Sequence, residues 1–386
     1  MTDAGAESLR DGSTLSIEHL GPGEGRGTGP AAQELLAFIT QPMSPWFSAA
    51  EAAGLTQCLS GAAHPALADH LFVGRREGRL AGAVWHGTAA DRPMVGVFGY
   101  VWTDPAARGL GIARALTRRS VDRFWADGGQ ASYLGTAEPT ARRVYEDHGY
   151  RAYHGAVMRA LRPGLDADDH EADWFEPGAP VTVRDATFAD VAAYTALVTH
   201  PGPAGWRVRD WTERLFVIPP LDPINSCTRP FLSTWVRHVS AASNVFRVAT
   251  VPGGGVVAAV AIASPATGAL AGSGTLEILA HPAHMGAAAP LIADALGRAA
   301  VLGVREVRAW ADRGDRADLL VGSAFREESV QPGMLTAGEE RIDVVVLRAE
   351  LALPPGRPFG HPMTEPATEP IGNDPDRPPV VRSVTP

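Results

Sequence analysis

The 386-residue sequence predicts an α/β (α+β) protein of two tandem domains, each a mixed, mostly antiparallel twisted sheet flanked by helices. Three observations lead to this prediction. The length suits two domains that each bury a core, strands and helices alternate as in a mixed sheet, and the same order of elements returns in the second half, which indicates an internal duplication. We expect an N-terminal domain over 1–162, an acidic linker over 163–180, a C-terminal domain over 181–353 and a proline-rich, disordered tail over 354–386.

In the first half, apolar periodicity and turn residues predict the elements in order. They are a strand over 14–20, a helix over 30–39, a helical stretch within 41–69, strands over 71–80 and 81–85 with a turn at Glu77-Gly78, a strand over 95–103, a helix ending near 127–129, a strand over 131–136, a helix over 138–148 and a strand pair over 150–161. The linker that follows is dense in carboxylates, so we expect a solvated connector without a functional role.

The second half repeats this order. Its predicted elements are strands at 181–187, 245–250, 256–263, 275–280, 307–311 and 341–351, and helices at 191–198, 287–302 and 316–321.

Composition limits the function classes. The chain has a net charge of −9 at pH 7, which argues against general binding to nucleic acid or to an anionic membrane. No apolar run approaches the roughly 20 residues that span a bilayer, and the N-terminus is unlike a signal peptide, so we expect a cytoplasmic protein. The two cysteines, Cys58 and Cys227, indicate neither a disulfide framework nor a cysteine zinc site. All 34 basic residues are arginine, which excludes Schiff-base and P-loop chemistry that needs lysine.

The stretch 103–116 predicts a site for an anion. It joins the apolar strand 95–103 to an amphipathic helix through a turn that contains Gly109 and Gly111. The first turn of a helix has N–H groups without helical partners and a partial positive charge, and glycine lets a ligand approach the backbone closely. A strand, a glycine turn and a helix start in this order favour phosphate binding.

Two motifs resemble those of the GCN5-related N-acetyltransferase (GNAT) superfamily. Residues 108–113, Arg-Gly-Leu-Gly-Ile-Ala, resemble its acyl-CoA pyrophosphate motif, and residues 141–150, Ala-Arg-Arg-Val-Tyr-Glu-Asp-His-Gly-Tyr, resemble its second signature. The resemblance covers 14–161 and, more weakly, 181–350. It implies two GNAT-like domains, with the first binding acyl-CoA.

The resemblance also implies roles for single residues. Main-chain groups of the strand before the motif pair with the pantetheine amides, and N–H groups of the motif bind the pyrophosphate. Tyr145 acts as general acid toward the CoA thiolate, against the alternative of an ordinary packed aromatic. The residues assigned to acetyl-CoA in this way are Val101, Trp102, Thr103, Arg108, Gly109, Leu110, Gly111, Ile112, Ala113, Arg114 and Glu138.

The sequence departs from the family pattern at two places. Glu138 stands where the family commonly has asparagine, and the strand 95–102 lacks the carboxylate that often serves as general base. The amine would then lose its proton through water or to a group from elsewhere, with His86 and Glu138 as candidate catalytic residues. A histidine beside a strand end is also consistent with a hydrogen-bonded core residue.

The second copy of the motif lacks the chemistry. When Pro282 is aligned with Pro105, Met285 replaces the arginine and Pro290 removes an N–H donor. Leu320 stands at the tyrosine position and has no proton to donate. We therefore expect a degenerate second domain. His281 and His284 lie three residues apart, but no third ligand follows at helical spacing, so we expect no metal.

These observations predict an acetyl-CoA-dependent N-acyltransferase that carries an acetyl group to an amine by direct attack on the thioester. The expected acceptor is the amine of a small molecule, and a protein lysine is the alternative. The second domain is expected to shape the acceptor cleft or a homodimer. Two other hypotheses stay open at this point. One is different acyl chemistry, either thioester hydrolysis or transfer to a hydroxyl, and the other is an acyl-CoA sensor without turnover.

Overall fold

The strands of the first half form one eight-stranded mixed sheet in the order β1-β2-β3-β4-β5-β6-β8-β7. The structure is a computed structural model, and it describes residues 2–23, 29–40, 49–63, 65–136, 138–200, 208–211, 214–217, 239, 244–264, 272–337 and 339–352. The elements of the first half are β1 (Thr2–Ser8), β2 (Thr14–Leu20), α1 (Pro30–Thr40), α2 (Ala49–Ser60), β3 (Leu67–Arg76), β4 (Arg79–Ala89), β5 (Val95–Thr103), η2 (Pro105–Ala107), α3 (Ile112–Ala126), β6 (Ala131–Gly135), α4 (Pro139–Glu146), β7 (Tyr150–His154) and β8 (Val157–Leu161).

The second half forms a seven-stranded sheet in the order β9-β12-β13-β14-β15-β17-β16, together with a separate two-stranded sheet. Its elements are α5 (Ala167–Phe175), β9 (Thr182–Asp185), η3 (Phe188–Asp190), α6 (Val191–Thr199), β10 (Val208–Trp211), β11 (Arg214–Val217), β12 (Val245–Thr250), β13 (Val256–Ala263), β14 (Ser273–Ala280), η4 (Pro282–Ala287), α8 (Ala288–Val301), β15 (Glu306–Ala311), α9 (Asp315–Gly322), β16 (Arg326–Ala337) and β17 (Glu340–Glu350).

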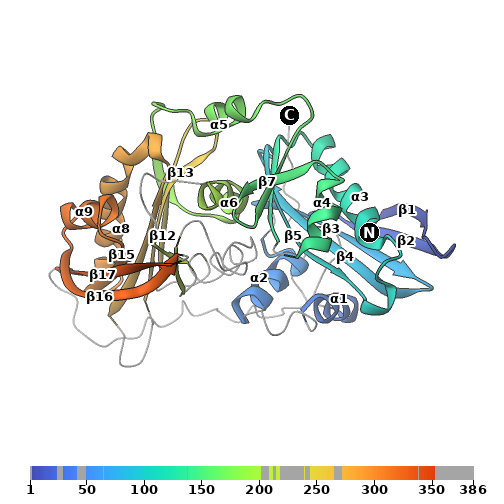
Figure 1. Cartoon of the computed structure of the whole chain (residues 1–386), viewed down its shortest axis with the longest axis horizontal. Helices are drawn as coiled ribbons and strands as arrows, with labels where there is room; N and C mark the ends of the chain where they lie inside the picture. The colour runs from blue at the N-terminus through green and yellow to red at the C-terminus, as the bar shows by residue number, and fades with distance from the viewer. Residues whose placement is uncertain are drawn as a thin grey trace, which may run out of the picture. The chain divides into compact units, whose positions relative to one another are not determined.

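Apart from the additional edge strand β1 of the first sheet, the two large sheets have the same strand order. Two mixed sheets flanked by helices confirm the predicted fold class (Figure 1). In each, neighbouring strands pair antiparallel except for one parallel pair, β5 with β6 in the first sheet and β14 with β15 in the second. In each, the helix that connects the parallel strands follows a short 3-10 turn. The sheets fall within the predicted ranges 1–162 and 181–353, yet residues 1–353 form one compact unit. The division into two domains stays a prediction.

Apolar residues on both faces of the first sheet hold the helices. On one face α3 packs against β3, β4 and β5, and its buried positions include Ile112, Leu116 and Phe124. On the other face α1 and α6 contact β4 and β5. This arrangement follows from β4, whose residues are buried on both faces from Leu80 to Thr88.

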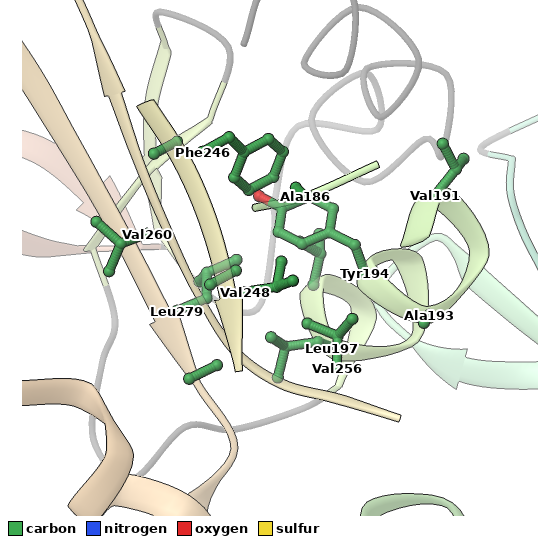
Figure 2. Packing of buried hydrophobic residues seen from close by; sticks show 14 of the residues in the cluster. Ala186, Val191, Ala193, Tyr194, Leu197, Phe246, Val248, Val256, Val260 and Leu279 are labelled. Atoms are coloured by element: carbon green, nitrogen blue, oxygen red, sulfur yellow. The ribbon is translucent and has the colours of Figure 1, made fainter. Parts of the chain in front are cut away.

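Helix α6 packs against both large sheets. All nine of its residues are buried, and it contacts β4 and β5 of the first sheet as well as β13 and β14 of the second. Figure 2 shows Tyr194 and Leu197 of α6 beside Phe246 and Val248 of β12. The rings of Tyr194 and Phe246 meet at 84° with centroids 5.5 Å apart. An all-round apolar helix is the expected sequence for such a shared layer.

Five described helices or strands differ from the sequence-based expectation, and two of them are the unpredicted strands β10 and β11. Strand β1 pairs with β2 across a bulge at Asp3 and Gly5, and β16 runs through a Pro-Gly pair whose register shift conceals the strand pattern. The expected solvated linker contains α5, in which His170, Trp174 and Phe175 are buried. The predicted tail and Cys227 lie outside the described residues. Within the described part of the chain, no helix is both long and apolar enough to cross a membrane.

Candidate active site

Strand β5 parts from β6 partway along its length. It pairs with β4 as far as Thr103, but its parallel ladder with β6 joins only 95–97 to 131–133. Just beyond that ladder, Tyr100 and Val101 form a bulge against β4, and Tyr100 has a φ of +51°. A positive φ is strained for a bulky residue. The bulge therefore redirects the last residues of β5, the segment predicted to face the pantetheine.

The loop after β5 is held by its own side chains. Asp104 caps η2, with its Oδ1 accepting the N–H of Ala106 at 2.8 Å. Arg108 donates from Nε to the carbonyl oxygen of Thr103 at 3.4 Å, and its guanidinium lies 4.9 Å from the centroid of the Trp102 ring. The exposed arginine is thereby positioned beside the end of β5.

Gly109 and Gly111 have left-handed φ angles of +81° and +99°. A Cβ on either would meet no atom within 4 Å, so packing does not require glycine there, whereas the backbone conformation does. Gly111 is the N-cap of α3 and makes no side-chain cap, so the first turn keeps its N–H groups for a ligand. Arg10 braces the loop, because its Nη1 donates to the Gly109 oxygen at 3.3 Å and its backbone N–H to the Leu110 oxygen at 3.2 Å.

Tyr145 lies where the two motifs meet. It is 7% exposed, and its ring stands edge-on to that of Phe98 in β5, with centroids 5.7 Å apart and an angle of 79°. Tyr150 contacts both rings, with its centroid 6.0 Å from that of Tyr145 and 5.8 Å from that of Phe98. An ion pair between Arg114 and Asp147 joins the first turn of α3 to the end of α4. Phe98 directly follows the last β5 residue paired with β6, so Tyr145 lies beside the point where the strands part.

Glu138, predicted as a cofactor contact and a candidate base, is the N-cap of α4. Its Oε2 accepts the N–H of Ala141 at 2.7 Å. This hydrogen bond, together with bonds from Thr140 and the charge of Arg108, holds the pKa of the Glu138 carboxyl below its usual value. A carboxylate with a lowered pKa is a weak base. The geometry therefore favours a capping role close to Arg108.

His86, the other candidate base, lies under α3. It is 3% exposed, its Nδ1 is 2.7 Å from Oγ of Ser120, and its ring stacks on that of His70 with centroids 4.7 Å apart. The strand register places it opposite Phe98. This environment matches the hydrogen-bonded core histidine that was the alternative to a catalytic base.

A buried carboxylate that the sequence did not predict as a site residue lies on the opposite face of the first sheet. Asp69 in β3 is 1% exposed and accepts a hydrogen bond from Nε1 of Trp85 at 3.3 Å. Trp85 in turn meets Tyr100 edge-on, with centroids 5.5 Å apart. The available signal was a single acidic residue among the apolar residues of 67–73.

In the second sheet, β14 and β15 part as β5 and β6 do, but the loop before the following helix has a different conformation. Strands β14 and β15 pair only over 273–275 and 306–308. Ala287, the N-cap of α8, has a right-handed φ of −80°, and Pro290 follows in the first turn. Leu320 is fully buried where the first half has Tyr145. The second copy thus differs from the first at each of these positions, and its loss of chemistry stays a prediction.

His281 and His284 do not form a pair of ligands. Nε2 of His284 lies 2.6 Å from the carbonyl oxygen of Phe175, whereas His281 faces His200 and Glu171. These partners come from segments far away in the sequence, which helical spacing does not reveal. Burial, with a smaller effect of the neighbouring histidines, lowers the pKa of His281 to about 4.

Comparison with protein families gives a match over the part of the chain that contains the glycine loop and Tyr145. Residues 68–152 match the model of the acetyltransferase (GNAT) domain. Solved structures with a similar fold include a GNAT superfamily phosphinothricin acetyltransferase from Sinorhizobium meliloti in complex with acetyl-CoA, at 16% identity over 44% of this chain and 88% of that chain, with a TM-score of 0.36. A ribosomal-protein-alanine N-acetyltransferase from Brucella melitensis gives 20% identity over 44% and 99%, with a TM-score of 0.34.

A variant of spermidine N-acetyltransferase SpeG from Vibrio cholerae gives 14% identity over 44% of this chain and 93% of that chain, with a TM-score of 0.34. These likenesses concern the fold alone. Comparison with curated proteins gives no match.

Proposed function

We propose that the acetyltransferase (GNAT) domain formed by residues 68–152 transfers an acetyl group from acetyl-CoA to the amine of a small molecule. One observation carries the proposal. The glycine loop at the start of α3 and the buried Tyr145 of α4 both lie beside the place where β5 parts from β6. A thioester placed there has anion-binding N–H groups on one side and a proton donor on the other.

Acetyl-CoA binding is assigned to the end of β5 and to the loop after it. Main-chain groups of 101–103 pair with the pantetheine amides, and the N–H groups of 109–114 bind the pyrophosphate. Arg108 adds its charge from beside Trp102. Such donors are fixed before the ligand arrives, so they need no reorganisation as charge develops.

The reaction is a direct acyl transfer. The amine nitrogen attacks the thioester carbonyl carbon, a C–N bond forms, and the C–S bond breaks with the electron pair leaving on sulfur. The phenol of Tyr145 protonates that thiolate and regains its proton from solvent, and the amine loses its own proton to a base. Because a phenol in water is a weaker acid than a thiol, the site has to favour this transfer. The products are the amide and free CoA.

We assign the amine's proton to Asp69, through an intervening water. Asp69 pairs with Gly87 in register, and Gly87 pairs with Val97, the last β5 residue in the ladder with β6. The carboxylate is thus level with the point where the strands part, on the face opposite α3. Trp85 orients it, as a positioning residue.

The enclosure of that face favours a small acceptor. Trp85 and Tyr100 are 1% and 3% exposed, and α6 packs over β4 and β5 on the same side. Because helices cover this face, we infer that a short amine reaches it more easily than a folded protein surface does. The second half would therefore shape the acceptor side through α6.

Thiol release from acetyl-CoA, measured with a panel of small amines, tests the proposal. We expect release that depends on the amine, with the acetylated amine detected by mass spectrometry. Release independent of any amine would show hydrolysis, and tight acetyl-CoA binding without release would show a sensor. Either result would overturn the proposal.

A further inference from the structure

Three side chains of types that can bind metal ions come together from three separate segments of the chain. Glu171 lies in α5, His200 directly follows α6, and His281 directly follows β14. One ligand atom from each lies within 4.8 Å of the other two. We propose that these three residues bind a divalent transition-metal ion of the zinc class, with water as the fourth ligand. This inference is independent of the proposed acetyl transfer.

One carboxylate oxygen of Glu171 is available to a metal ion, and the other one is bound by neighbouring side chains. Its Oε1 accepts the hydroxyl proton of Tyr153 at 2.9 Å and pairs with Arg159. Its Oε2 is buried and has no hydrogen-bond partner within the described part of the chain, and it lies 3.9 Å from Nε2 of His200. A buried carboxylate oxygen without a partner is costly. A metal ion would satisfy it, while Tyr153 and Arg159 act as the outer shell that orients a ligating carboxylate.

The two imidazoles are held in place by packing. The ring of His281 stacks on Phe175 with centroids 4.2 Å apart, and it lies 4.7 Å from the ring of His200 at an angle of 65°. The N–H of Ala283 points at Nδ1 of His281 over 3.3 Å, which is long for a hydrogen bond. Metal binding therefore replaces one weak contact at this ring.

The spacing suits a zinc-like ion after a small closure. Metal–ligand bonds of roughly 2.0–2.1 Å place tetrahedral ligand atoms about 3.3 Å apart. The present separations exceed this by about 1.5 Å at most, which side-chain rotation can supply. Two imidazoles and one carboxylate with an open position are the ligand set of many zinc sites. Nitrogen ligands select such ions over Mg²⁺ and Ca²⁺, which prefer oxygen.

One of the three ligands, His281, comes from the second copy of the loop that joins a strand to a helix in the first half. When Pro282 is aligned with Pro105, His281 stands in the place of Asp104. The two side chains have the same N-cap role: His281 accepts the N–H of Ala283, and Asp104 accepts that of Ala106. The second copy has thus lost its left-handed glycines and gained a side chain that binds cations. An ion here would tie α5 and α6 to the loop after β14, so we expect it to stabilise the fold.

The experiment uses the full chain, purified without a histidine tag and stripped with a chelator. Zn²⁺ is titrated by calorimetry, and Co²⁺ is added separately to record its visible spectrum. We expect one ion per chain, a cobalt spectrum of the tetrahedral or five-coordinate type, and a Tm that rises with Zn²⁺ and falls again with chelator. A folded wild-type protein that binds neither ion at micromolar concentration overturns the proposal.

Variants locate the ion. Glu171→Gln, His200→Asn and His281→Asn should each weaken Zn²⁺ binding by at least tenfold and abolish the cobalt spectrum. His284→Gln is the matched control, because His284 lies close by but bonds to Phe175, and it should bind Zn²⁺ as the wild type does. Unchanged binding in the three ligand variants contradicts the assignment. If a ligand variant does not fold, X-ray absorption of the zinc-loaded wild type decides between two imidazole ligands and none.

Discussion

Phe98 and Tyr145 stand edge-on, with ring centroids 5.7 Å apart, and so connect the strand that parts from its neighbour with the helix that carries the second motif. Edge-to-face aromatic pairs have a preferred geometry. The contact therefore fixes where the phenol of Tyr145 lies relative to β5. A packed ring and a proton donor are compatible roles for the same residue.

Tyr145→Phe separates the two roles, because it keeps the ring and removes the hydroxyl. We expect kcat to fall by about 10²–10⁴-fold, as on loss of a general acid, with the Kd for acetyl-CoA nearly unchanged. Tyr150→Phe is the control. This variant removes the buried hydroxyl of the neighbouring ring, which lies 2.7 Å from Oγ of Ser132. Its kcat should stay close to that of the wild type. Unchanged turnover in Tyr145→Phe would remove Tyr145 from the mechanism.

Gly111→Val tests the pyrophosphate site. A Cβ there meets no protein atom, so the expected loss of acetyl-CoA binding reflects the left-handed φ and the space taken from the ligand. Gly286→Val is the matched control in the second copy, where the glycine is exposed and a Cβ also has room. Ala288, aligned with Gly111, is fully buried and unsuited to a bulky replacement. Calorimetry should give one CoA per chain for the control and none for Gly111→Val. Two CoA per wild-type chain would contradict a single competent copy.

Asp69→Asn tests the assigned proton acceptor. Asparagine still offers an oxygen to Nε1 of Trp85, so the fold should be kept while kcat falls by about 10²-fold or more. Trp85→Phe loses the hydrogen bond and keeps the carboxylate, so its kcat should fall much less. A wild-type kcat in Asp69→Asn would assign the proton to another group.

Much of the fold follows from local sequence. Strand β5 spans exactly the predicted 95–103, because β-branched and aromatic residues fill it and Asp104-Pro105 ends it. The turn of Glu77 and Gly78 has two positive φ angles, as a tight hairpin requires. The glycine loop and Tyr145 were singled out because their motifs resemble those of a known family. The structure has the expected helices at both motifs, α3 and α4, and the roles of the residues toward acetyl-CoA stay a prediction.

The rest depends on contacts between distant segments. His170 and Trp174 are four residues apart and lie on the same, buried side of α5. The carboxylates around them led to the prediction of a solvated linker instead of a packed helix. The meeting of Glu171, His200 and His281 depends on the packing of α5 and α6 against the second sheet, which sequence spacing does not encode. The same holds for Asp69, which reaches the level of the cofactor site only through the register of three strands.

His86→Asn tests the role of the buried histidine. If His86 only packs, the variant should lose about 1–3 kcal/mol of stability, because Oγ of Ser120 loses its buried partner. The pH–rate profile should stay as in the wild type. Ser120→Ala removes the other half of the same contact and should behave alike in both measurements. A profile that changes only in His86→Asn would instead make His86 the base.

Glu138→Ala tests the capping role through its pH dependence. The pKa of Glu138 is lowered in the folded protein, mainly by the N–H of Ala141. Its contribution to the free energy of unfolding is therefore complete above the unfolded pKa, near 4.5, and is lost as the pH falls through the lower folded value. We expect the variant to be less stable by up to about 1 kcal/mol at pH 7 and the difference to shrink toward pH 3. Denaturant unfolding of both proteins at pH 3, 4, 5 and 7 measures this, with Glu146→Ala at the other end of α4 as the control. A stability difference that stays constant across this range would show that the carboxylate does not cap the helix.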